Sequence, residues 1–110
     1  MHLETIRDYK LADWKYEKIM KEIFDFEQQL DDQHEIALNL ASFGSNILLN
    51  VVHIEYQNPD ILYFFGYVNG TYSQLIQHVS QLNFLLTSVP KDDPTKPPRR
   101  IGFQVNTEEK

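Results

Sequence analysis

The period of the hydrophobic pattern changes once along this chain of 110 residues, close to Asp32, and the change restricts the folds it can adopt. Before that point, apolar residues recur at intervals of three and four, the spacing of one stripe on an amphipathic helix. Because the stripe is too short for a stable coiled coil, we expect a helix from Asp13, its cap, to about Asp32 that packs on a sheet. The stripe consists of Tyr16, Ile19, Ile23, Phe26 and Leu30.

After Asp32 the apolar residues alternate with polar ones, which is the pattern of β-strands. The connections between these segments are short, so neighbouring strands must run antiparallel. Asn69-Gly70 is the most specific turn signal, because a type I′ hairpin needs two residues at positive φ. The expected strands cover residues 35–43, 47–56, 61–68 and 71–78.

The C-terminal third of the chain is expected to complete the fold. Ser80 is a suitable cap for a short helix over 81–89. The proline-rich segment 91–100 predicts an irregular surface connection, and residues 101–105 predict a fifth strand. Within the connection, Arg99-Arg100 is expected to form an intramolecular salt bridge with the acidic middle of the chain.

The fold class that these elements predict is α+β: an N-terminal long helix packed on a four- to five-stranded antiparallel meander sheet, with a short helix before the last strand. The length of the chain fits one globular domain. We expect that domain to cover residues 13–105, between an N-terminal extension over 1–12, frayed or helical, and a polar tail over 106–110.

Turn lengths also predict which side chains share a face of the sheet, because successive side chains on a strand point to opposite faces. A two-residue turn at Gly44-Ser45 pairs Leu38 with Val51. A four-residue loop after Tyr56 pairs that residue with Ile61. One face is then aliphatic and suits the helix, although a bulge would exchange residues between the faces. The other face is aromatic. Its residues on the second, third and fourth expected strands are Asn50, Val52, Ile54, Tyr56, Ile61, Tyr63, Phe65, Tyr67, Tyr72, Gln74, Ile76 and His78.

Charge is unevenly distributed along the chain, whose formal net charge is −6. From Glu22 to Pro90 there are eight acidic residues and no Lys or Arg, hence a formal charge of −8 for that stretch. Proteins that bind nucleic acids or anionic membranes use Lys and Arg to neutralise phosphates. The middle of the chain therefore argues against a nucleic-acid partner and against a membrane surface.

Cysteine is absent, which removes disulfides, thiol catalysis and cysteine-based zinc sites. The first residues lack the basic start and apolar core of a signal peptide, and no apolar run of about 18 residues occurs. We therefore expect a cytoplasmic protein, in which Asn69-Gly70-Thr71 is a turn and not a glycosylation site.

The sequence contains none of the common catalytic motifs. It has no glycine-rich phosphate loop, no Gly-x-Ser-x-Gly elbow and no His-Glu-x-x-His helix. The predicted register places His53 and His78 on opposite faces of the sheet, so they are not expected to share a metal ion. His34 lies beside Asp31 and Asp32, where a solvated acidic turn is favoured over a cation site. We therefore assign no catalytic residue, no metal and no cofactor.

Several short motifs occur in a recognisable order. They are Trp14-x-Tyr16-Glu17, Phe26-Glu27-x-x-Leu30-Asp31, Ser42-Phe43-Gly44, Gln74-Leu75-Ile76-Gln77-His78-x-Ser80-Gln81-Leu82 and Arg99-Arg100-Ile101-Gly102-Phe103. On these motifs, residues 14–105 resemble a small bacterial family classified only as a domain of unknown function. The resemblance implies a compact bacterial protein and transfers no catalytic residue.

The aromatic face of the predicted sheet provides the functional hypothesis. One long and one short helix do not obviously cover both faces, and large exposed apolar surfaces mark contact sites. The sequence therefore favours a non-enzymatic protein-interaction or self-associating module, most simply a homodimer. The alternative is a small-ligand-binding domain or an enzyme that uses the same face. The expected interaction residues are Tyr63, Phe65, Tyr67, Tyr72 and His78.

A competing explanation keeps the protein monomeric. In it, the expected short helix folds back and covers the aromatic face. The residues that would do so are Leu82, Phe84, Leu85 and Leu86. Association is favoured over this arrangement.

Overall fold

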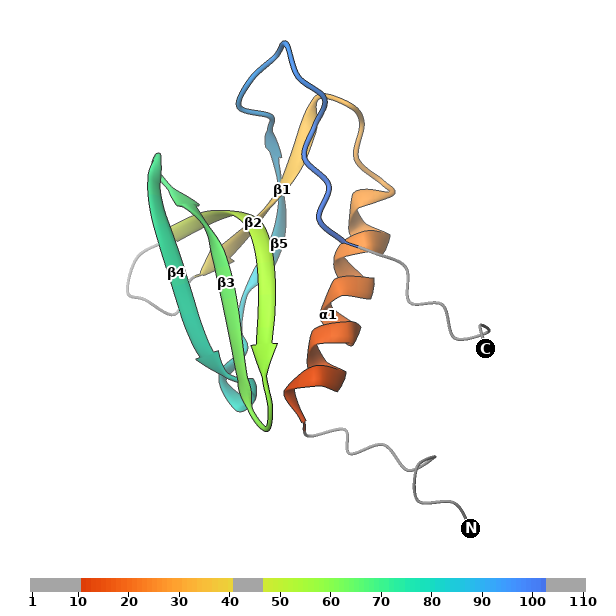
Figure 1. The fold of residues 1–110 in the computed structure, drawn as a ribbon. Coiled ribbons are helices and arrows are strands. Elements are labelled where there is room, and N and C mark those ends of the chain that lie inside the picture. The colour runs from red at the N-terminus through yellow and green to blue at the C-terminus, as the bar shows by residue number, and fades with distance from the viewer. Residues whose placement is uncertain (1–10, 41–46, 103–110) are drawn as a thin grey trace.

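The computed structural model describes residues 11–40 and 47–102, in which one helix is followed by a five-stranded sheet (Figure 1). The strand order is β4-β3-β2-β1-β5, and every neighbouring pair is antiparallel. This architecture confirms the α+β fold class. The elements are α1 (Ala12–Glu27), β1 (His34–Leu40), β2 (Ile47–Gln57), β3 (Ile61–Val68), β4 (Thr71–His78), the 3-10 turn η3 (Val79–Gln81) and β5 (Leu85–Pro90).

The start of α1 is set by a distant turn. The sequence predicted Asp13 as the cap. The helix instead begins at Ala12, so Asp13 lies in its first turn. The capping groups come from the turn between β2 and β3: the Ala12 N–H donates to the Pro59 carbonyl at 2.7 Å, which orders that end. The Asp13 N–H donates to Asn58 Oδ1 at 3.0 Å. The local sequence alone does not encode this start.

The end of α1 is set by a local turn. The helix stops at Glu27 and does not continue to Asp32, because the chain turns around the carboxylate of Asp31. One oxygen of that carboxylate accepts the Gln33 N–H at 2.9 Å and lies 2.7 Å from His34 Nδ1. Short aspartate turns of this kind compete with helical hydrogen bonding.

The inner face of the sheet, which we define as the side that packs on α1, forms the hydrophobic core. Met20 and Ile23 of the helix are buried against it, while Tyr16, Ile19 and Phe26 are partly buried. The helical stripe therefore packs on the sheet as its spacing predicts, except for Leu30, which lies after the end of the helix. The sheet residues of this core are Ile36, Leu38, Leu40, Leu49, Val51, Ile54, Leu62 and Phe64.

The first four strands lie where the alternation predicts them, as far as the described residues extend. The turn expected at Gly44-Ser45 lies outside those residues. The register beside it is shifted by two residues from the expected one, because Leu38 pairs with Leu49 and not with Val51. A shift of two keeps each side chain on its expected face, since the side-chain period of a strand is two.

The hairpin of β3 and β4 is regular throughout. Asn69 and Gly70 have φ values of 51° and 81°, so both adopt the left-handed conformation that the turn signal predicts. From this turn the two strands pair without a register shift to Ile61 and His78. β4 therefore has no bulge.

The pairing of β2 with β3 departs from the predicted register. The two strands pair Gln57 with Ile61 at their turn, so the expected register is wrong by one residue there. The register then shifts at a β-bulge between Val51 and His53, where β2 has one extra residue. Gly66 of β3 faces this region, and a Cβ on it would lie 2.3 Å from a carbonyl oxygen of β2. Glycine is therefore required for the close approach of the two backbones.

The bulge exchanges the residues at the end of β2 between the two faces. Ile54 is buried in the core, and the ring of Tyr56 lies 5.0 Å from that of Tyr16 on the helix. The prediction that Ile54 and Tyr56 lie on the aromatic face was therefore wrong. His53, expected on the aliphatic face, instead stacks on the outward ring of Phe65. The prediction failed because a bulge leaves no mark in the alternation of apolar residues.

The segment after β4 also differs from the prediction. Residues 85–90, expected in a short helix over 81–89, form β5, which pairs with β1, and only the turn η3 precedes it. The fifth strand is therefore β5 and not 101–105: Ile101 and Gly102 are in no strand, and 103–105 lie outside the described residues. The preference of leucines for helices misled the prediction, because tertiary packing overrides such propensities.

Candidate functional site

The outer face of the sheet, opposite the inner face, carries a row of aromatic rings. The rings of Tyr63 and Phe65 on β3 have centroids 6.4 Å apart and planes inclined by 22°. His53 of β2 is the cross-strand partner of Phe65, and the two rings lie 5.8 Å apart with planes inclined by 29°. Tyr67 and Tyr72 form an edge-to-face pair at 5.4 Å. Four of the expected interaction residues thus lie together, and His53 joins them because of the bulge.

An open depression of about 530 Å³ lies among these rings. It contains the Glu55 carboxylate, which forms a hydrogen bond with His53 Nε2, and the Tyr63 hydroxyl, which donates to Gln57 Oε1 at 2.9 Å. Tyr67 does not line it but contacts Tyr72, which does. The full lining is Val52, His53, Glu55, Tyr56, Gln57, Tyr63, Phe65, Tyr72 and Gln74. Sequence reasoning placed Tyr63, Tyr72 and Gln74 on this face but missed His53, Glu55 and Gln57, because these three come from the bulged end of β2.

The alternative arrangement, in which residues 81–89 cover this face, does not occur. Leu82, Phe84 and Leu86 pack against the core, and the ring of Phe84 meets that of the buried Phe64 edge to face at 5.6 Å. Leu85 is 63% exposed. These residues therefore do not cover the aromatic face, which the competing monomer explanation requires.

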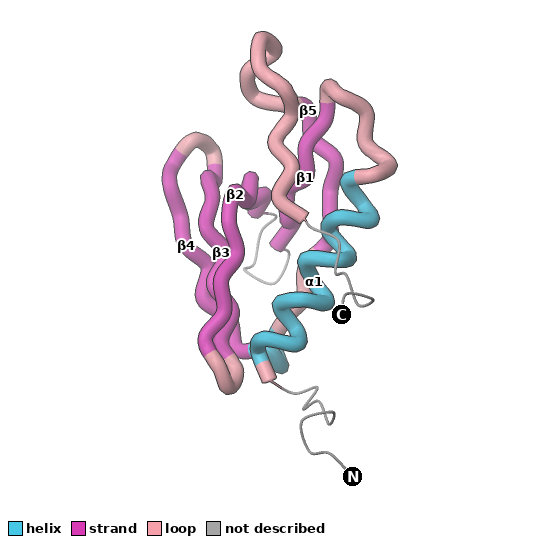
Figure 2. Tube along the Cα trace, turned by 45° about the vertical axis from the view of Figure 1, so that its right-hand side comes forward, coloured by secondary structure: helices cyan, strands magenta, loops and turns pink. Residues whose placement is uncertain are grey.

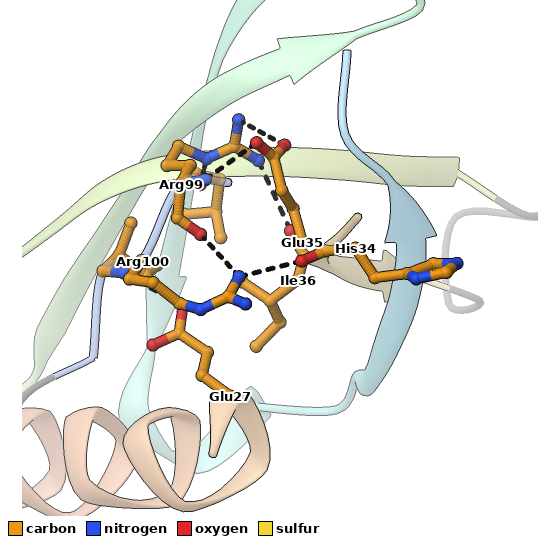
Figure 3. A network of polar contacts seen from close by, with 8 residues as sticks. Glu27, His34, Glu35, Ile36, Arg99 and Arg100 are labelled. Carbon is orange, nitrogen blue, oxygen red and sulfur yellow. Dashed lines mark hydrogen bonds and ion pairs between the residues drawn. The ribbon is translucent and has the colours of Figure 1, made fainter. Parts of the chain in front are cut away.

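A second group of polar side chains lies where the segment after β5 crosses between β1 and α1 (Figures 1 and 2). Arg99 forms an ion pair with the buried Glu35, with 3.1 Å between Nη1 and Oε1, and its own N–H donates to the same carboxylate at 2.8 Å. Its Nε donates to the Val51 carbonyl at 3.0 Å. The predicted salt bridge between this segment and the acidic middle is confirmed (Figure 3).

The same segment is also held by Arg100 and by the helix. Arg100 donates to the carbonyl oxygens of His34 at 2.8 Å and Asp31 at 2.9 Å. The buried Glu27 carboxylate of α1 accepts the N–H groups of Ile101 and Gly102, at 2.9 and 3.0 Å. Residues 99–102 with Glu27 and Glu35, hereafter the arginine clasp, thus join α1, β1 and β2.

Comparison with known protein families places almost the whole chain in one family. A model of a family of unknown function, DUF6173, matches residues 7–104. The chain belongs to the DUF6173 family. No curated protein and no solved structure matches it. Within residues 11–40 and 47–102, the DUF6173 chain has no helix long and apolar enough to cross a membrane.

His78 of this DUF6173 chain lies apart from the aromatic row. It lines a separate depression of about 420 Å³, near Lys15 at the start of the helix. Its Nε2 lies 3.0 Å from Asp60 Oδ2, and its Nδ1 lies 2.8 Å from Ser80 Oγ. The backbone N–H of Ser80 also donates to Nδ1, at 3.1 Å. Although Asp, His and Ser recur in hydrolase triads, this ring caps η3 through its Nδ1.

The two histidines expected on opposite faces belong to two different depressions. The prediction that His53 lies on the aliphatic face was wrong, because the β-bulge in β2 brings its ring beside Phe65 on the outer face. In the described ranges, no three His, Asp or Glu side chains are close enough together to hold a metal ion.

Two pKa shifts describe the electrostatics near these groups. The hydrogen bond from His34, the Gln33 N–H and the nearby Arg100 lower the pKa of Asp31. Partial burial, followed by the charge of Glu55, raises the pKa of Tyr16. The negative charge of Glu55 therefore acts on both the outer depression and the helix.

Proposed function

We propose that this DUF6173 chain is a non-enzymatic interaction module that self-associates as a symmetric dimer through the edge of β4. The observation that carries the proposal is the character of that edge. From Thr71 to His78 the strand has no Lys, Arg, Asp, Glu or Pro, and its pairing with β3 has no bulge. Natural edge strands are usually guarded by one of these features, because unpaired N–H and C=O groups recruit further strands.

The other edge of the sheet is guarded. β5 has six residues, ends at Pro90 and is followed by Lys91 and two aspartates. β4 has eight residues and is the strand farthest from α1 in both views (Figures 1 and 2). Tyr72 and Ile76 on it are 60% and 57% exposed. The contrast favours β4 as the contact edge.

A second copy of the chain suits this edge. Residues opposite one another in antiparallel strands point to the same face, so a two-fold axis must pass beside a residue that faces itself. With Gln74 at the axis, Tyr72 of one copy faces Ile76 of the other. The aromatic rows of both copies then form one continuous surface, and the exposed side chains of β4 gain apolar neighbours.

Light scattering on purified protein tests this association. We expect the unmodified chain to show twice its mass of 13.0 kDa and the variant Ile76→Lys to show the single mass, because each lysine would then be desolvated against Tyr72 of the other copy without an opposite charge. Leu85→Lys is the matched control, since Leu85 is equally exposed on the guarded edge. The proposal fails if the unmodified protein is monomeric at its highest soluble concentration, or if Leu85→Lys alone disrupts the dimer.

Crosslinking tests the position of the axis. The chain contains no cysteine, so a single Gln74→Cys replacement places one thiol on each copy. Facing residues of an antiparallel pair lie close enough for a disulfide. We expect Gln74→Cys to form a covalent dimer on mild oxidation, and Ser88→Cys on β5 to stay uncrosslinked. The opposite pattern would place the contact on β5.

A further inference from the structure

We infer that the depression on the outer face binds a guanidinium group, carried by an arginine side chain or an arginine-like small molecule. The inference goes beyond the proposed function, because the site is complete within one copy of the chain. Its volume of about 530 Å³ lies within the range of small-molecule sites.

The charge of the site selects a cation. Its lining includes the Glu55 carboxylate and no Lys or Arg. The sequence contributes none nearby on these strands either, since neither residue type occurs between Glu22 and Pro90. Carboxylates and the faces of aromatic rings both attract positive charge. A bound anion would find no compensating cation in this lining.

The shape and hydrogen bonding of the site favour guanidinium over ammonium. The rings of His53, Phe65 and Tyr63 are inclined by only 29° and 22° between neighbours. A planar guanidinium stacks on such rings and loses less hydration than an ammonium does. It also carries five N–H donors and no acceptor, and the carboxylate of Glu55 and the side-chain carbonyls of Gln57 and Gln74 accept hydrogen bonds.

Two probes of matched shape test the inference. Argininamide carries the guanidinium, and citrullinamide replaces it with a neutral urea group of similar size. We expect argininamide to shift the amide resonances of Tyr63, Phe65 and Gln74 in NMR titrations, and citrullinamide to bind about tenfold more weakly. Equal binding of the two probes would overturn the inference. So would resonance shifts spread over the whole acidic surface.

Variants of the chain locate the interaction. Tyr63→Leu keeps an apolar side chain but removes the ring, and we expect it to weaken argininamide binding about twofold to fivefold. Glu55→Gln removes the charge and should weaken binding by a similar factor. Asp92→Asn is the matched control, because it removes the same charge from an exposed position outside the depression. A loss as large in Asp92→Asn as in Glu55→Gln would show that net charge alone attracts the probe.

Two further titrations define the source of the group and its relation to the dimer. A capped tripeptide with central arginine that binds more tightly than argininamide would identify a peptide partner, and weaker binding would identify a free small molecule. Argininamide should bind equally well when the unmodified chain is diluted until light scattering shows single copies. Loss of binding on dilution would overturn a site contained in one copy, whatever the outcome for the dimer.

Discussion

The two faces of the sheet differ in what their side chains meet, and two adjacent residues of β3 show this most directly. Phe64 points inward, is fully buried and meets Phe84 edge to face. Phe65 points outward and lines an open depression. The side chains of the inner face are therefore enclosed by the fold itself, whereas the aromatic side chains of the outer face border an open depression.

Polar groups also differ in burial. In the arginine clasp, the carboxylates of Glu27 and Glu35 are almost fully buried, and each accepts hydrogen bonds from backbone N–H groups of residues 99–102. Outside, Glu55 is more than half exposed beside His53. Buried charges must be paired for the fold to be stable, while an exposed carboxylate keeps its attraction for a ligand.

The largest expected effect comes from the matched pair on β3. Phe64→Ala should lower the free energy of unfolding by about 3–5 kcal/mol, because it opens a cavity in the core. Phe65→Ala should cost about 1 kcal/mol in the monomer, since its ring is only partly buried and borders an open depression. Urea denaturation of both variants in the Ile76→Lys background, which is expected to be monomeric, measures the difference. Equal losses would show that the outer row also stabilises the fold.

The arginine clasp gives the next effect. Arg99→Ala should lower the free energy of unfolding by about 3 kcal/mol, because it leaves Glu35 buried without its cation. Arg100→Ala is the control: its guanidinium is exposed and donates to carbonyl oxygens, so the loss should be about 1 kcal/mol. Thermal unfolding of both variants separates the two values. A larger loss from Arg100→Ala would mean that the carbonyl contacts hold the segment.

The sequence predicts the inner face better than the outer one. The helical stripe around Ile23 and the alternation around Phe64 are set by burial, which leaves a strong periodic signal. The Asn69-Gly70 turn was also predictable, because its backbone conformation restricts the residues that fit. These features suffice for the fold class and for the packing of the helix on the sheet.

The candidate site was predictable only in part. Tyr63, Phe65 and Tyr72 follow from alternation, but His53 and Glu55 reach the outer face through a bulge that the apolar pattern does not reveal. The period-two spacing of Leu82, Phe84 and Leu86 was the available signal for an extended segment after β4. Helix propensity concealed it.

The smallest expected effect concerns a charge that acts across the two faces. Burial and the charge of Glu55 raise the pKa of Tyr16, so the folded protein keeps this phenol protonated at pH values where the unfolded chain, with a pKa of about 10, has released the proton. The unfolded state then binds fewer protons than the folded state. The free energy of unfolding must therefore fall as the pH rises above about 10.

Tyr16→Phe removes this contribution, so the variant should lose less stability than the unmodified protein when urea denaturation is repeated above pH 10. Glu55→Gln should remove part of it, because burial still raises the pKa of Tyr16 when the charge is gone. Identical pH profiles for all three proteins would show that Glu55 has no electrostatic influence on Tyr16. Its charge would then act only outward, toward the depression, and the two faces would be electrostatically separate.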